Sequence, residues 1–317
     1  MIESALVTTV NASLSGVSTI DTNGLGATFS GVLSGTGGIA KAGAGTLQLS
    51  GINSYAGGTF LTAGILKVTA DNNLGASTGA LTFNGGTLQF GSGFNTARSI
   101  TLNGGTVDTN GFNTTFSGQI NGPGSLAKTG AGVLTLSGNT NYSGATFINQ
   151  GTVRAGAANA FSPNSAFTVA SGATLDLNGF GQTIGSLAGV GSVTLGAAAL
   201  TAGGDNTSTT FSGIMSGTGG LIKTGGGTLT LSGVNTYTGG TAINAGTLAV
   251  TTDANLGAVS SGLTFGGGTL QFLAGFTSNR GTTFSAGGGA FDTNGNSATL
   301  GGTIGGIGGV TRAASGR

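Results

Sequence analysis

Few side chains in this sequence can transfer protons or hold a metal ion. The chain contains eight Asp and Glu residues, nine Lys and Arg residues, and no His or Cys. Six of the acids stand in two recurring motifs: Asp21, Asp108, Asp176 and Asp292 in Asp-x-Asn-Gly, and Asp71 and Asp253 in Asp-x-Asn-Leu-Gly. A glycosidase-type acid or base is expected once, beside unlike partners, whereas a recurring Asp followed by Asn is typical of Asx turns and corner caps. The motifs therefore predict turns at all six positions.

Two acids, Glu3 and Asp205, lie outside these motifs. Glu3 is close to the start of the sequence, and Asp205 follows two glycines and precedes Asn206, which favours a turn. One enzyme hypothesis stays open as a minor alternative: a polysaccharide-processing β-helix that uses Asp205 with an Arg from a neighbouring coil. Unchanged behaviour of Asp205→Ala in a polysaccharide assay would remove it.

The basic residues and the tyrosines recur in the same way as the acids. Lys41, Lys128 and Lys223 occupy one repeat position, Arg98 and Arg280 a second, Lys67 and Arg154 a third, and Tyr55, Tyr142 and Tyr237 a fourth. Recurrence of this kind indicates a role in the scaffold. The tyrosines are therefore expected to pack at corners and not to form a platform for sugars.

Whole classes of function are excluded by what the sequence lacks. Without His or Cys there is no zinc site of the Cys/His type, no disulfide and no nucleophilic Cys. There is no G-x-G-x-x-G motif and no Gly-Lys pair for a P-loop. Charged residues make up 5% of the chain and the net charge is +1, so no nucleic-acid partner is expected. We expect no catalytic, metal-binding or cofactor-binding residue, and the binding residues stay unknown.

Long internal repeats organise the chain. A segment that begins near Phe29 returns near Phe116 and again near Phe211. A second block, Leu81-Thr-Phe83, returns as Leu263-Thr-Phe265. The sequence has no leader of the signal-peptide type and no run of eighteen apolar residues, so neither a signal peptide nor a spanning helix is expected in it.

A shorter period lies inside the long one. The pattern Gly-Thr-apolar-x-apolar centres on Leu47, Leu66, Leu88 and Val107, at steps of roughly twenty residues. Each occurrence alternates apolar and polar residues, which predicts a short strand with one buried face. Strands that recur at this spacing, with glycine at the turns, predict an all-β parallel β-helix: one continuous solenoid over residues 1–317, with roughly sixteen coils of about twenty residues.

The outward positions of these strands carry the polar side chains. Gln48, Lys67, Gln89, Asp108 and Arg154 are expected to project from one face of the sheet, on different coils. A solvated face is the favoured interpretation, and a ligand-binding stripe is the alternative. A Lys67–Asp108 pair on this face would be exposed and would contribute little to stability.

Two phrases of the sequence resemble a known family. They are Gly-x-Gly-Gly-[Ile/Leu]-x-Lys-x-Gly-x-Gly-Thr-Leu-x-Leu-Ser-Gly and Asn-x-Tyr-x-Gly-Gly-Thr, and they are similar to the passenger-associated transport repeat of bacterial autotransporters. The resemblance covers most of residues 21–300; the middle copy departs from it at Pro123, Ser125, Thr140 and Ala145. It implies a right-handed β-helix that a C-terminal membrane barrel, absent from this sequence, exports to the cell surface. No residue-level function comes with it.

Three hypotheses about function follow. The leading one is a non-catalytic, secreted or surface-exposed rod that serves as a stalk or adhesin and contacts a host or cell-surface receptor or a glycan. The alternative is a filament subunit that stacks head-to-tail, because neither end of the sequence resembles a helical or charged cap. The polysaccharide-processing enzyme is the third.

Overall fold

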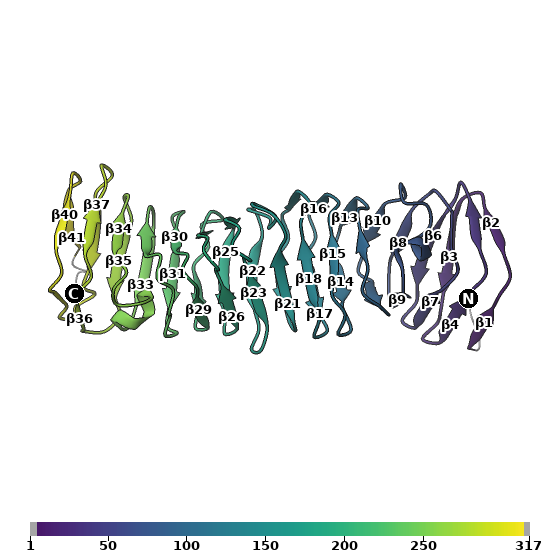
Figure 1. Cartoon of the computed structure of the whole chain (residues 1–317), viewed down its shortest axis with the longest axis horizontal. Helices are drawn as coiled ribbons and strands as arrows, with labels where there is room; N and C mark the ends of the chain where they lie inside the picture. Colours follow the sequence, from purple (N-terminus) through teal and green to yellow (C-terminus); the bar gives the residue numbers. More distant parts are fainter. Residues whose placement is uncertain (1–4, 314–317) are drawn as a thin grey trace. The chain divides into compact units, whose positions relative to one another are not determined.

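The computed structural model describes residues 5–313 and consists of short parallel strands with two four-residue 3-10 helices. It is an all-β parallel solenoid of about 15 turns with about 20 residues in each turn, which confirms the predicted fold class. The chain divides into two compact units, Met1–Ala160 and Phe161–Arg317. Figure 1 shows their strands, coloured from purple to teal in the first unit and from teal to yellow in the second.

In the first unit the strands form three principal sheets. The first sheet holds β1 (Leu6–Thr8), β4 (Gly26–Phe29), β7 (Thr46–Leu49), β9 (Ile65–Val68), β11 (Thr87–Phe90), β14 (Gly105–Asp108), β17 (Leu126–Thr129) and β20 (Thr146–Ile148). The second holds β3 (Val17–Asp21), β6 (Gly38–Ala42), β8 (Thr59–Leu61), β10 (Leu81–Phe83), β13 (Ile100–Leu102), β16 (Ile120–Gly122) and β19 (Thr140–Tyr142). The third holds β12 (Asn95–Thr96), β15 (Thr114–Phe116), β18 (Val133–Leu136) and β21 (Thr152–Ala155), while β2 (Ala12–Leu14) and β5 (Leu33–Gly35) form a separate pair. The 3-10 helix η1 spans Asp71–Leu74.

The second unit has the same kind of arrangement. One sheet holds β22 (Ala166–Val169), β25 (Ser186–Gly189), β28 (Thr209–Phe211), β31 (Thr228–Leu231), β33 (Thr247–Val250), β35 (Thr269–Phe272), β38 (Gly289–Asp292) and β41 (Val310–Ala313). Another holds β24 (Gln182–Ile184), β27 (Leu200–Ala202), β30 (Leu221–Lys223), β32 (Thr241–Ile243), β34 (Leu263–Phe265), β37 (Thr282–Phe284) and β40 (Ile304–Gly306). The remaining strands are β23 (Thr174–Asp176), β26 (Ser192–Thr194) and β29 (Ile214–Ser216), and the pair β36 (Thr277–Ser278) and β39 (Thr299–Leu300). The 3-10 helix η2 spans Asp253–Leu256.

The core of each unit is built by in-register stacking of apolar side chains. Leu47 pairs with Leu66, Leu66 with Leu88 and Leu88 with Val107 in successive parallel strands, and all four side chains are fully buried. Alternate residues point to opposite faces of a strand, so the residues between these four point outward. The predicted stacking of the Gly-Thr-apolar-x-apolar pattern is therefore confirmed.

The long sequence repeat does not span a whole number of turns. From β7 the first sheet continues through β9, β11 and β14 to β17, four turns later. The strand that matches β7 in the second repeat is β18, which follows β17 in the chain and belongs to the third sheet. The second repeat therefore lies one face further around the solenoid than the first, within the same unit.

This rotation corrects the prediction for Arg154. Gln48, Lys67, Gln89 and Asp108 do lie in one row, in register on successive strands. Arg154 lies on β21 in the third sheet, where it pairs with Thr135 of β18. The prediction that it shares their face was wrong, because the offset between the first two repeats is four turns and one face.

Turns between the strands follow the predicted Asx chemistry in the Asp-x-Asn-Gly motifs. The backbone N–H of Asn23 donates to Asp21 at 2.8 Å, and Asn110, Asn178 and Asn294 donate in the same way to Asp108, Asp176 and Asp292. Each of these Asn residues has a φ between 47° and 51°, a conformation that Asn tolerates better than most residues. Among residues 5–313, no helix has both the length and the apolar character needed to cross a membrane.

Candidate functional site

The three recurring lysines are buried at corners of the solenoid. The Lys41 ammonium donates to the carbonyls of Ala42 and Gly43 at 2.7 Å each and to Ala63, on the next turn, at 3.1 Å. Lys128 and Lys223 make the same three kinds of contact. Burial lowers the pKa of all three lysines, that of Lys128 to about 8, while a nearby aspartate opposes the shift. Their predicted role in the scaffold is confirmed, because each ammonium joins two turns through backbone carbonyls.

The two recurring arginines pair with the two aspartates that begin the 3-10 helices. Arg98 Nε lies 3.0 Å from Asp71 Oδ1, and Arg280 Nε lies 2.8 Å from Asp253 Oδ1. Each guanidinium is almost fully buried and also donates to several backbone carbonyls of the segment that follows the 3-10 helix. The prediction at Asp71 and Asp253 was an Asx turn or a corner cap. An Asx turn is not formed: each aspartate begins a 3-10 helix, and its carboxylate binds an arginine on the following turn of the solenoid.

The tyrosines are internal, as predicted. Tyr55, Tyr142 and Tyr237 are fully buried, and each hydroxyl shares a hydrogen bond of 2.6–2.7 Å with a threonine four residues later. Burial raises the pKa of Tyr55 and of Tyr237 to about 12. Rings in this position cannot serve as an exposed sugar platform.

Asp205 occupies a turn and is held by hydroxyl and backbone donors. Its carboxylate accepts hydrogen bonds from Ser186 Oγ at 2.6 Å and from the Thr207 N–H and Oγ at 3.0 and 2.8 Å. Burial raises the pKa of Asp205, but these hydrogen bonds outweigh burial and the net pKa is lowered. The negative charge of Asp205 acts on Lys223, whose pKa it raises against the effect of burial. The structure therefore does not bring an arginine to Asp205, and the predicted turn is confirmed.

The outward row of the first unit is partly exposed, and two of its members pair with each other. Gln89 Nε2 donates to Asp108 Oδ2 at 2.8 Å, and Lys67 lies beside Gln89 in register, two strands from Asp108. The same Gln–Asp pair recurs as Gln271 and Asp292 in the second unit. Asp108 is thus bound by a glutamine and not by Lys67. Over residues 5–313, no three His, Cys, Asp or Glu side chains gather closely enough to hold a metal ion.

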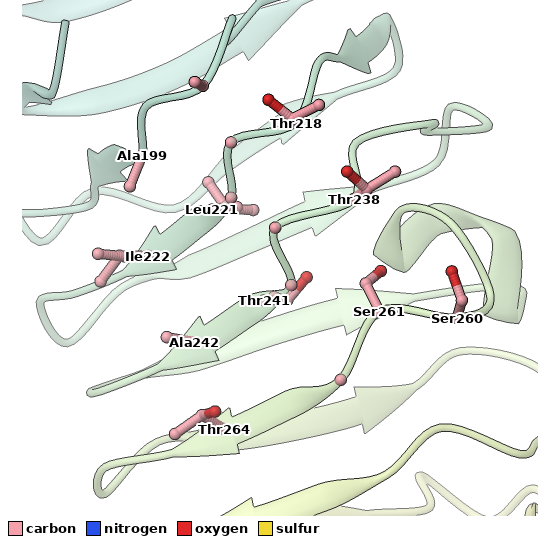
Figure 2. Close-up of a pocket in the computed structure, with 16 residues that line it drawn as sticks. Ala199, Thr218, Leu221, Ile222, Thr238, Thr241, Ala242, Ser260, Ser261 and Thr264 are labelled. Carbon is pink, nitrogen blue, oxygen red and sulfur yellow. The ribbon is translucent and has the colours of Figure 1, made fainter. Parts of the chain in front are cut away.

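A groove of about 700 Å³ lies on the second unit, across β30, β32 and β34 and the turns that lead into them. Ile222, Ala242 and Thr264 form one side of it and follow one another in register on these three strands. Thr218, Thr238 and Ser260 form the other side, with their hydroxyls exposed (Figure 2). Between the two sides run Gly219, Gly220, Gly239, Gly240 and Gly262, whose missing side chains leave backbone as the floor.

Glycine is required in this floor because successive turns approach closely. A Cβ on Gly219 would lie 1.7 Å from the carbonyl oxygen of Ala198 on the preceding turn. No charged side chain lines the groove. It is consequently an uncharged groove with the hydroxyls of Thr218, Thr238 and Ser260 along one side and Ile222, Ala242 and Thr264 along the other. No motif of the sequence predicted this groove. One difference between the repeats marks its position: Thr241-Ala-Ile243 stands where the other two repeats have Thr59-Phe-Leu61 and Thr146-Phe-Ile148.

Comparison with known proteins identifies the repeats. The passenger-associated-transport-repeat family matches residues 39–68, 126–155 and 221–250. The chain is 39% identical over 236 residues to the adhesin BmaC autotransporter of Brucella suis biovar 1 (strain 1330). That match covers 67% of this chain but only 7% of the relative. No solved structure matches the chain. The predicted resemblance is confirmed: the chain carries three passenger-associated transport repeats and is similar to part of an autotransporter adhesin.

Proposed function

We propose that this chain is a non-catalytic segment of an autotransporter passenger that is exported to the bacterial cell surface, where it serves as a stalk and as an adhesive surface. The relative with 39% identity is named an adhesin, and the three transport repeats belong to passengers. Both findings support export and adhesion as the activity of the protein that contains this segment.

The observation that carries the non-catalytic part of the proposal is the use of the ionisable side chains. The recurring lysines bind backbone carbonyls, the buried arginines bind aspartates, and the buried tyrosines bind threonines. Asp205, the one candidate for acid–base duty, is held by Ser186 and Thr207 with a lowered pKa. A general acid needs a raised pKa near neutral pH, so this environment is unsuited to that role.

Surface display tests the proposal. The full chain would be fused between a secretion signal and a translocator barrel, and exposure would be measured by antibody binding and protease access on intact bacteria. We expect display at the surface and adhesion of the bacteria to host cells above that of bacteria displaying the barrel alone. Retention inside the cell, or adhesion equal to that of the control, would contradict the proposal.

The purified chain also permits a direct test of catalysis. Incubation with a panel of acidic and neutral polysaccharides should release no reducing ends and no unsaturated products. Saturable turnover that is lost in Asp205→Ala would overturn the non-catalytic assignment. Head-to-tail association stays a prediction: long unbranched fibres of constant width in electron micrographs would favour it, and single particles at high concentration would count against it.

A further inference from the structure

The groove across β30, β32 and β34 lies where two neighbouring side chains differ from those of the other repeats. Ala242 stands where they have Phe60 and Phe147, and Ile222 stands where they have Ala40 and Ala127. Ala242 stands at the centre of its apolar side, with Ile222 before it and Thr264 after it in register. Figure 2 shows these three residues in a row along one side of the groove, with Thr218, Thr238 and Ser260 along the other.

The first unit contains the same segment with the central position filled. The residue that matches Ala242 in the first repeat is Phe60. Phe60 pairs in register with Ala40 on one side and Thr82 on the other, and its ring is half-buried. Ala242 therefore lacks the ring that this position of the fold holds in the first unit. The neighbour of that ring is Ala40, whereas the neighbour of Ala242 is the larger Ile222, which forms part of the apolar wall beside the vacant position.

The hydroxyl side of the groove also differs between the two copies. Thr238 stands where the first unit has Ala56. The hydroxyls of Thr238 and Ser260 are exposed and make no hydrogen bond within the part of the chain that the structure describes, whereas Thr218 donates to the Gly196 carbonyl at 3.2 Å. Two unbonded hydroxyls therefore face solvent beside the vacant ring position, on successive turns.

These features select the chemistry of the occupant. The groove has no charged side chain, so it offers no partner for an anionic or cationic group, whose desolvation would cost free energy. A hexopyranose is a six-membered ring with an apolar C–H face and a hydroxyl edge, and it therefore matches both sides of the groove. Because equivalent groups recur on successive turns at about 4.8 Å, a ligand with repeating units can lie along them.

We propose that this groove binds a neutral polysaccharide chain, with one pyranose ring over Ala242 and its hydroxyls toward Thr238 and Ser260. The proposal rests on the proposed adhesive function and names the ligand class of that surface. It places the binding site in the third repeat alone, since the equivalent positions of the other two repeats are occupied by Phe60 and Phe147.

Two variants that copy residues of the first repeat test the proposal. Ala242→Phe introduces the residue that the fold carries at position 60, and Thr238→Ala introduces the residue that it carries at position 56. Binding of the purified full chain to an array of neutral and charged glycans, followed by titration calorimetry with the neutral oligosaccharide that binds best, gives the readout. Gln48→Ala, on the outward row of the first unit, is the matched control.

We expect binding to neutral glycans, at least tenfold weaker binding for Ala242→Phe, a few-fold loss for Thr238→Ala and no change for Gln48→Ala. Thermal unfolding of Ala242→Phe should match that of the unaltered chain. Several results would overturn the proposal: no neutral glycan binds, Ala242→Phe binds as well as the unaltered chain, or the groove accepts aromatic peptides and no sugar. Bacteria that display Ala242→Phe and adhere normally would contradict the groove assignment while leaving the proposed function intact.

Discussion

Arg98 forms an ion pair with Asp71, the residue that begins the 3-10 helix η1, and so links η1 to the following turn of the first unit. Its Nε lies 3.0 Å from Asp71 Oδ1, and its terminal nitrogens donate to the carbonyls of Gly75, Ala76 and Gly79. The Arg98 side chain is 1% exposed and that of Asp71 is 30% exposed. One guanidinium thus donates to three carbonyl groups of the segment that follows the 3-10 helix, in addition to its ion pair with Asp71.

Removal of Arg98 should destabilise the first unit strongly. Arg98→Ala removes the donor to the carbonyls of Gly75 and Gly79 and the cation that pairs with Asp71, and we expect a loss of about 3 kcal/mol in the free energy of unfolding. Arg98→Lys should recover only part of this loss, because an ammonium cannot reproduce the planar array of donors. Urea unfolding followed by circular dichroism measures both, with Lys67→Ala as the control. A loss from Arg98→Ala as small as that from Lys67→Ala would contradict the structural role.

The tyrosine–threonine pairs should contribute individually to stability. Tyr55→Phe keeps the buried ring and removes the hydroxyl that lies 2.7 Å from Thr59, and a cost of about 1–2 kcal/mol is expected. Val234→Ala, which trims an exposed side chain, should cost less than about 0.5 kcal/mol. Thermal unfolding of Tyr55→Phe and Val234→Ala measures the two losses of stability. Equal midpoints would mean that the hydroxyl contact is not formed.

Stability should rise and then fall as the pH is raised above 8. The pKa of Lys128 is lowered to about 8 from 10.5, so between these values the unfolded chain binds more protons than the folded chain, and unfolding becomes less favourable as pH increases. Tyr55 and Tyr237 have a pKa of about 12 in place of 10, so above pH 10 the unfolded chain releases protons that the folded chain keeps, and stability falls. The two effects place the maximum near pH 10.

The melting temperature measured from pH 7 to pH 11 checks this expectation. Lys128→Met, which removes one titrating group with a lowered pKa, should reduce the rise between pH 8 and pH 10. It should also lower the melting temperature at pH 7, because the carbonyls of Gly130 and Gln150 lose the Lys128 ammonium as a donor. A steady fall from pH 7 upward, or an unchanged slope in the variant, would contradict the assigned shifts.

Glycine at the end of η1 should be irreplaceable. Gly75 has a φ of +82°, and a Cβ there would lie 2.5 Å from the carbonyl oxygen of Tyr55 and 2.7 Å from its ring. Gly75→Ala is therefore expected to cost at least about 2 kcal/mol. Gly26→Ala, where a Cβ would meet nothing within 4 Å, should be tolerated. Comparable destabilisation of the two variants would argue against the close approach of Tyr55 to η1.

Much of the fold was readable from the sequence because it depends on local pattern. The step of roughly twenty residues between Leu47, Leu66 and Leu88 already contains the turn length, and alternation of apolar and polar residues fixes the face of each strand. The Asx turns and the structural role of the lysines followed from recurrence alone.

The features that the sequence did not reveal depend on how many turns separate two residues and on which face of the solenoid each residue lies. Arg154 was misplaced because one long repeat carries the chain through four turns and one further face, which no local pattern records. The Arg98–Asp71 pair joins residues on different turns across η1, so its formation depends on how that insertion folds. The groove is defined by an absent side chain, and it becomes visible only when Ala242 is aligned with Phe60.

In-register stacking of β30, β32 and β34 supports both the fold and the groove, and crosslinking tests it directly. The chain has no cysteine, so the pairs Ile222→Cys/Ala242→Cys, Ala242→Cys/Thr264→Cys and Ile222→Cys/Thr264→Cys can be oxidised without competing thiols. Adjacent strands lie about 4.8 Å apart, within the reach of a disulfide, whereas two steps of about 9.6 Å exceed it. We predict that the first two pairs form an intramolecular disulfide and the third does not. Preferential crosslinking of positions 222 and 264, or no crosslink in either adjacent pair, would contradict the stacking on which the groove depends.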